Sequence, residues 1–80
     1  MLTKYIATAM EKAKYELLED GTFYGEIAEC EGVWGNGNTL EGCREDLQDA
    51  LEGWIILGFR LGHSFPILDG IDLNLSQKVA

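Results

Sequence analysis

The sequence predicts an α+β fold of order α-β-β-β-α-β, in which an antiparallel meander sheet carries one long helix and the architecture is partly RNase-H-like. Three observations predict this order. Residues 14–28 alternate with a period of two on both sides of an Asp20-Gly21 dipeptide, as two strands joined by a tight turn do. Residues 40–61 repeat apolar side chains every three or four positions, the period of a helix. Residues 71–75 alternate again, as a last strand with one buried face would.

Residues 2–13 are expected to form an amphipathic helix that precedes the sheet. Tyr5 and Met10 share its apolar side, whereas Lys4 and Lys12 lie towards the other side. A helix of about three turns is marginal in isolation, so its apolar side must pack on something. The sequence leaves open whether that surface belongs to this chain or to a neighbouring subunit.

The meander is expected to contain strands at residues 14–18, 22–28 and 33–36. Asp-Gly tolerates the positive φ angles of a tight hairpin turn, so it joins the first two strands. Gly25 in the middle of the second strand removes side-chain packing, and such a glycine marks a bulge or the close approach of another element. The third strand completes an antiparallel unit before the long helix begins.

The long helix is expected to follow a glycine-rich turn that contains Gly35 and Gly37. Thr39 can cap the helix because its hydroxyl can accept a hydrogen bond from a free amide of the first turn. Gly62 can end the helix in a left-handed conformation. The apolar stripe expected to cover the sheet consists of Leu40, Cys43, Leu47, Ala50, Leu51, Trp54, Leu57, Gly58 and Leu61.

Size and composition predict one domain, residues 1–80, that self-associates. A chain of this length buries only about 60–65 % of the surface that its unfolded form exposes. Yet 46 % of its residues are hydrophobic, which is more apolar surface than a lone small domain hides. We therefore expect a dimer or tetramer. The expected interface residues are Ile55, Ile56 and Phe59, which lie off the main stripe, together with Tyr5 and Met10 of the first helix.

The charge of the chain restricts its partners. Fourteen acidic and six basic residues give a net charge of -8, which repels nucleic-acid phosphates and anionic membranes. We expect no direct nucleic-acid partner and no membrane partner, although acidity also serves solubility alone. The surface on which a basic protein partner is expected first is the polar side of the long helix, formed by Glu41, Glu45, Asp49 and Glu52.

The remaining chemistry-bearing residues predict neither a cofactor nor a metal site. Cys30 and Cys43 lack the spacing of a zinc site, and no hydrophobic leader is recognised, so a cytoplasmic location with reduced thiols is expected. Cys43 is expected to be buried on the apolar stripe, and Cys30 to lie in a turn where it is open to exposure. His63 follows the helix end, where a cation is stabilised by the carbonyl dipole, and no nucleophile accompanies it.

A longer motif gives a family resemblance. The motif Glu31-Gly32-x-x-Gly35-x-Gly37-x-Thr39, the long helix and a Gly62-x-x-x-Pro66 exit together resemble the HicB-like antitoxin family over residues 14–75. The resemblance implies a partial RNase-H-like fold without nuclease chemistry. It also implies an oligomer that covers the active surface of a small basic RNA-cleaving toxin.

The sequence departs from that family in three places. Because it stops shortly after the expected last strand, we do not expect the DNA-binding segment that many family members carry. It adds the helix of residues 2–13, and it has Gly42 where the family commonly has an acidic residue, which removes a capping box. An orphan scaffold that self-assembles without a toxin therefore remains an alternative.

A divergent metal-dependent RNase-H-like nuclease is the leading alternative. Such an enzyme needs several carboxylates that converge on two metal ions about 4 Å apart. Candidates are Glu16 on the first strand, Glu45 or Asp49 on the long helix, and Asp72 on the last strand. The helical candidates lie opposite the apolar stripe and so face solvent, which favours a non-enzymatic binding protein.

Overall fold

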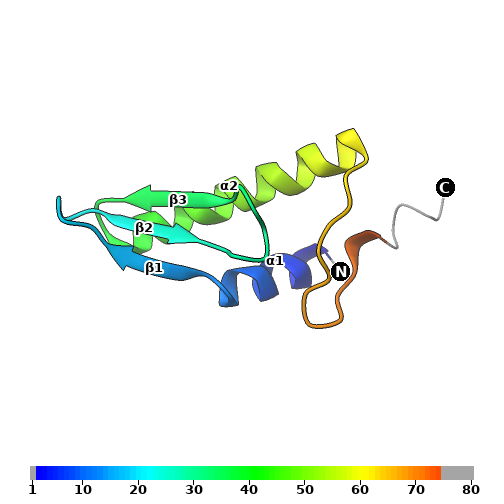
Figure 1. The fold of residues 1–80 in the computed structure, drawn as a ribbon, viewed down its shortest axis with the longest axis horizontal. Coiled ribbons are helices and arrows are strands. Elements are labelled where there is room, and N and C mark those ends of the chain that lie inside the picture. The colour runs from blue at the N-terminus through cyan, green and yellow to red at the C-terminus, as the bar shows by residue number, and fades with distance from the viewer. Residues whose placement is uncertain (1, 75–80) are drawn as a thin grey trace.

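The computed structural model describes residues 2–74 (Figure 1). Its elements are helix α1 (Leu2–Glu11), strands β1 (Lys14–Leu17), β2 (Phe23–Glu26) and β3 (Trp34–Gly37), and helix α2 (Leu40–Leu61). The predicted α+β class is confirmed, as is the predicted order of elements as far as α2.

The three strands form one antiparallel sheet in the order β1-β2-β3. Tyr15 lies opposite Gly25, which lies opposite Gly35, so these three residues share the face that α2 covers. The predicted Asp-Gly turn joins β1 to β2. Gly21 has a φ of +87°, and Asp20 Oδ1 accepts hydrogen bonds from the backbone nitrogen of Thr22 at 3.0 Å and from its hydroxyl at 2.6 Å.

Helix α2 lies directly on β3, and two glycines make that approach possible. A Cβ atom on Gly35 would come within 2.5 Å of the backbone nitrogen of Leu47, and one on Gly37 within 2.6 Å of that of Cys43. Gly35 thus lies in a strand, as the expected strand at residues 33–36 places it, and Gly37 lies in the same strand and not in the expected glycine-rich turn. They belong to β3, where the absence of a side chain lets backbone pack on backbone. Gly25 likewise marks a close approach, by the Tyr15 ring and the Cys43 sulfur.

The predicted ends of α2 are confirmed. The Thr39 hydroxyl accepts a hydrogen bond from the Gly42 backbone nitrogen at 2.9 Å. Gly62 is left-handed, with a φ of +72°, and the backbone nitrogen of His63 donates to the Gly58 carbonyl at 2.9 Å. Both ends of this long helix thus have partners for backbone groups that would otherwise be free.

The buried face of α2 is rotated relative to the predicted stripe. Ile55 is 2 % exposed and belongs to the core, whereas Leu40, Leu57 and Leu61 are exposed. The reason is that α1 packs beside the sheet and covers the side of α2 on which Ile55 lies. The buried residues of α2 are Cys43, Leu47, Leu51, Ile55 and Gly58.

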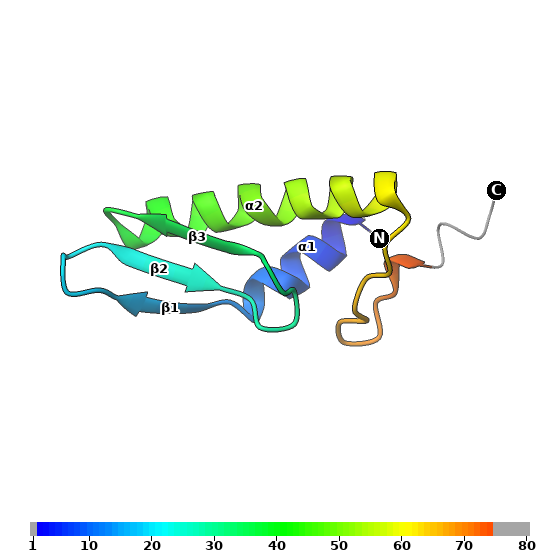
Figure 2. The ribbon, with the colours of Figure 1, turned by 45° about the horizontal axis from the view of Figure 1, so that its top comes forward.

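Helix α1 packs within the chain. Figure 2 shows the sheet along the N-terminal part of α2, and α1 and the segment after α2 along the remainder. Tyr5 is fully buried, and its hydroxyl donates to the Pro66 carbonyl at 2.7 Å. Lys12 forms an ion pair with Asp69 at 2.9 Å. These contacts attach the first helix to the segment that follows the last one.

The predicted last strand is not formed by residues 71–74, and Leu75 lies outside the described residues. Instead, Leu68 and Ile71 form an isolated bridge around a tight turn in which Asp69 has a φ of +49°. The Asn74 side chain then takes the place of a strand partner. Its nitrogen donates to the Phe65 carbonyl and its oxygen accepts from the Phe65 backbone nitrogen, both at 2.8 Å.

Candidate protein interaction surface

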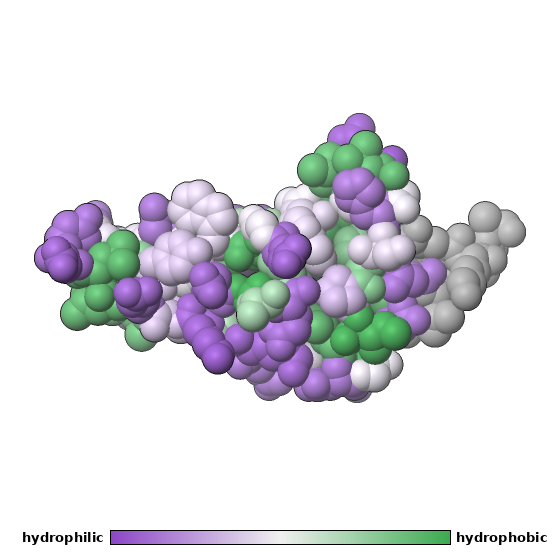
Figure 3. Space-filling model, in the orientation of Figure 1, coloured by the Kyte–Doolittle hydropathy of each residue, from purple (hydrophilic) through white to green (hydrophobic). Residues whose placement is uncertain are grey.

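One face of the sheet has no helix on it. Alternation along the strands turns every second side chain away from α2, and the pairing of strands places these residues beside one another. No described helix covers this side in either ribbon view, and Figure 3 looks onto it. We call it the outer sheet face. Its members are Lys14, Glu16, Tyr24, Glu26, Trp34 and Asn36.

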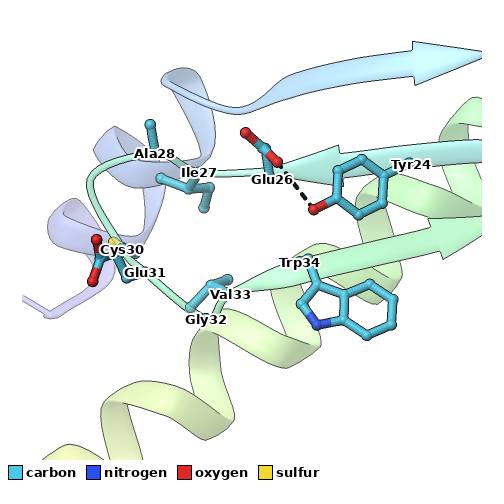
Figure 4. A pocket seen from close by; sticks show the side chains of 9 residues that line it. All are labelled: Tyr24, Glu26, Ile27, Ala28, Cys30, Glu31, Gly32, Val33 and Trp34. Atoms are coloured by element: carbon cyan, nitrogen blue, oxygen red, sulfur yellow. Dashed lines mark hydrogen bonds between the residues drawn. The ribbon is translucent and has the colours of Figure 1, made fainter.

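Two aromatic rings stack on the outer sheet face. Tyr24 and Trp34 are diagonal neighbours on β2 and β3, with ring centroids 6.1 Å apart and planes inclined by 25°. Trp34 is 52 % exposed. The Tyr24 hydroxyl donates to Glu26 Oε1 at 3.0 Å, and this bond to a carboxylate raises the pKa of Tyr24 (Figure 4). The bond fixes the tyrosine ring beside the tryptophan ring.

A hollow continues from the stacked rings towards the loop between β2 and β3. Its volume is about 210 Å³, and Figure 4 shows Tyr24 and Trp34 at one end and the side chains of the loop at the other. The loop residues Ile27, Cys30 and Val33 are buried. The outer sheet face therefore combines an open aromatic pair with a concave neighbour.

Cys30 is buried, although its position in a turn left it open to exposure in the sequence. Burial raises the pKa of its thiol to about 11, and the nearby Glu29 carboxylate acts in the same direction. Cys43 is buried as predicted, and burial raises the pKa of its thiol as well. Both thiols are free. Both thiols therefore act as packing groups of the core, and their burial suppresses the reactive thiolate form.

The predicted acidic surface on α2 is largely solvent-exposed. Glu41, Glu45 and Asp49 are exposed, and Glu52 is half-buried and accepts a hydrogen bond from Gln48 at 3.1 Å. Among residues 2–74, the pair between Lys12 and Asp69 is the one ion pair within 4.0 Å. Within the described residues, none of the α2 carboxylates therefore has a basic side chain within 4.0 Å.

The carboxylates considered for a nuclease do not converge. Glu16 lies on the outer sheet face, whereas Glu45 and Asp49 are on α2, which covers the opposite face. Asp72 belongs to the segment after α2, near Tyr5. No group of three potential metal ligands occurs within the described residues.

The predicted oligomer interface divides into exposed and buried residues. Ile56 is 58 % exposed and Phe59 is 38 % exposed, whereas Tyr5, Met10 and Ile55 are core residues. The placement of these three on an outer surface is corrected, because α1 docks on α2 of the same chain. Ile56 and Leu2 also line an apolar hollow of about 210 Å³. Figure 3 shows hydrophobic side chains gathered at the C-terminal end of α2.

The aromatic pair was not singled out from the sequence. Every second residue of β2 and β3 faces away from the helix, and the pairing of Glu26 with Trp34 places Tyr24, Glu26 and Trp34 on that face. Alternation predicts this placement only when the register of the two strands is known. The register depends on the turn between β2 and β3. The signal available in the sequence was the combination of Tyr24 and Glu26 on one strand with Trp34 on the next.

These features define a small α+β domain in which one helix covers one sheet face and no described helix covers the other. The family model described as UPF0150-like matches residues 4–66, and the chain belongs to that family. The crystal structure of TTHA0281 from Thermus thermophilus is similar, with a TM-score of 0.85 and 40 % sequence identity over 90 % of each chain. Comparison with curated proteins gives no match.

None of the helices within residues 2–74 is long and apolar enough to cross a bilayer.

Proposed function

We propose that this UPF0150-like chain is a non-enzymatic binding protein of the HicB-like antitoxin type, which neutralises a small basic RNA-cleaving toxin. One observation carries the proposal. The chain has a net charge of -8, and the single ion pair among its described residues, between Lys12 and Asp69, leaves the acidic side chains of the outer sheet face and of α2 without an ion-pair partner. Uncompensated charge of one sign speeds encounter with a partner of the opposite sign and disfavours partners of the same sign.

The placement of the acidic side chains supports binding over catalysis. Glu16 and the α2 carboxylates lie on opposite sides of the sheet, so they do not meet around a common metal pair. A binding protein has no such requirement, because separated carboxylates can each contact a different basic group of a large partner. The HicB-like motif ending at Thr39 is compatible with this function.

Self-association is part of the proposal. Ile56 and Phe59 form an exposed apolar area on α2, away from the outer sheet face. Burying such an area against a second copy would supply apolar contact that a chain of this size lacks by itself. The outer sheet face would remain free for the partner, and so would Glu41 and Glu45 near the start of α2, whereas Glu52 lines the same hollow as Ile56.

The test uses the reading frame beside this one in the host genome. We expect that frame to encode a short basic chain whose expression alone arrests growth and degrades RNA. Coexpression of the acidic chain should restore growth, and the two purified chains should elute together. A neighbouring frame that is acidic, or toxicity that the acidic chain leaves unchanged, would contradict the proposal.

An inactive toxin variant serves as the control for the elution experiment. It should bind the acidic chain as tightly as the active toxin, because the proposed neutralisation is by binding. An acidic chain that degrades the toxin's RNA substrate by itself would instead point to the nuclease alternative.

A further inference from the structure

The outer sheet face contains a preformed aromatic platform. Tyr24 and Trp34 lie nearly parallel, 6.1 Å apart, and the hydrogen bond between Tyr24 and Glu26 holds one ring in place. An indole that is 52 % exposed leaves its ring accessible for contact. Cations bind over such rings when they lie within about 6 Å of the centroid.

Two carboxylates border this platform. Glu26 lies opposite Trp34 across the β2–β3 pair, and Glu16 lies opposite Tyr24 across the β1–β2 pair. Neither forms an ion pair with a described residue, although Lys14 lies opposite Glu26 on the same face. A hollow of about 160 Å³ is lined by Lys14, Glu16, Tyr24 and Glu26 among others, so space for a further side chain adjoins the carboxylates.

Aromatic rings and carboxylates together select a particular cation. A guanidinium group is planar, so it can stack on a ring while its edge donates hydrogen bonds to a carboxylate. A lysine ammonium is more strongly hydrated and lacks the flat stacking surface. A nucleic-acid base could also stack, but its phosphates would meet Glu16, Glu26 and a chain of net charge -8.

We propose that the outer sheet face binds an arginine side chain of a basic protein partner, with the guanidinium stacked on Trp34 and hydrogen-bonded to Glu26. This inference rests on the proposed function for the existence of a basic partner, and it names the surface that receives it. It assigns the docking site to the sheet, whereas the acidic face of α2 assists encounter by its charge.

The first experiment uses a tetra-arginine peptide with blocked ends as the probe. The indole N–H signals of Trp34 and Trp54 are followed by NMR during titration, and Trp54→Phe assigns them. We expect the Trp34 signal to shift with tetra-arginine, to shift less with tetra-lysine and to stay unchanged with tetra-glutamate. The Trp54 signal should not move, because that ring packs on Phe65.

Two variants test the named contacts. Glu26→Gln keeps the shape of the side chain and removes its charge, and Trp34→Ala removes the exposed ring. Each should weaken tetra-arginine binding by about tenfold, the loss typical of a charge-assisted contact. Glu45→Gln on α2 removes the same charge from the other surface and serves as the matched control, with affinity within about twofold of the unmodified chain at matched ionic strength.

Several results would overturn the inference. One is that tetra-arginine shifts the amide signals of α2 and leaves the Trp34 signal unchanged. Another is that tetra-arginine binds both variants as tightly as the unmodified chain. A third is that single-stranded RNA binds at Trp34 more tightly than tetra-arginine does. The two proposals fail separately. A basic partner that binds the Trp34→Ala chain at full affinity overturns the docking site alone. Tetra-arginine binding at Trp34 with no basic partner in the host overturns the proposed function and leaves only the arginine-binding property of the outer sheet face.

Discussion

Gly35 of β3 lies so close to Leu47 of α2 that a Cβ atom on the glycine would stand 2.5 Å from the leucine backbone nitrogen. Because the obstruction is backbone, no side-chain rotation relieves it. The helix and the sheet meet at this point, and the position of α2 along the sheet depends on it. Gly35 thus determines how the long helix is seated.

The first prediction follows from that contact. Gly35→Ala should lower the free energy of unfolding by about 2–3 kcal/mol, since α2 must move away from β3 and lose packing. Urea denaturation followed by circular dichroism measures the change. Gly53→Ala is the control, because a Cβ atom at this exposed position of α2 has nothing within 4 Å. That variant should instead gain about 0.5–1 kcal/mol from the higher helix propensity of alanine.

The second prediction concerns the end of α2. Gly62 has a φ of +72°, a conformation that costs an alanine about 1 kcal/mol more than a glycine. Gly62→Ala should therefore lower the midpoint of urea denaturation. Gly62→Asn should lower it less, because asparagine tolerates the left-handed conformation better than alanine does. Equal losses in the two variants would show that another property of the site, and not its backbone angle, sets the cost.

The helix boundaries could be predicted because they depend on local chemistry. The Thr39 hydroxyl caps the start of α2 as predicted, Gly62 ends it in the left-handed conformation that a glycine tolerates, and Asp20-Gly21 forms the predicted turn. The buried face of α2 could not be predicted to the same degree. Ile55 is buried and Leu57 is exposed because of where α1 docks, and this is a contact between segments distant in sequence.

The last predicted strand illustrates the same limit. Alternation at Ile71 and Leu73 is compatible with a strand, yet a strand also needs a partner edge. Asn74 satisfies both backbone groups of Phe65 with its side chain, and this pairing across the turn takes the place of a ladder. The candidate site was missed for a related reason. Tyr24 and Trp34 meet only when the register of β2 and β3 is fixed.

The third prediction is a loss of stability at alkaline pH. The pKa of Cys30 is about 11 in the folded chain, against an ordinary value of 9.0, because burial disfavours the thiolate. The unfolded chain therefore releases this proton first as pH rises. The stabilisation is fully present below pH 9 and is lost between pH 9 and 11, by about 3 kcal/mol in all.

A variant isolates that contribution. Cys30→Ala should show a smaller fall in the free energy of unfolding between pH 9 and 11 than the unmodified chain, as measured by urea denaturation at fixed ionic strength. Part of the fall should remain, because burial also raises the pKa of Tyr5. Curves of equal slope for the two chains would exclude the thiol as the titrating group.

The fourth prediction is that the chain self-associates through the exposed apolar end of α2. Light scattering at micromolar concentration should give a mass above the 8.9 kDa of one chain. Ile56→Glu should lower that mass, because a charge would be placed in the buried contact, and Ile56→Glu with Phe59→Glu should lower it further. The single variant is the cleaner one, since the Phe59 ring also contacts Phe65, with centroids 4.9 Å apart.

Leu17→Glu is the matched control for this patch. Leu17 is 64 % exposed and lies on β1 by the first hairpin, away from the C-terminal end of α2. Leu17→Glu, like Ile56→Glu, replaces a branched aliphatic side chain by a charged one, but it leaves the Ile56 surface unchanged. Its mass should equal that of the unmodified chain. A monomer before any substitution would refute self-association, and a drop in mass with Leu17→Glu alone would place the interface at the hairpin and the β1 edge instead.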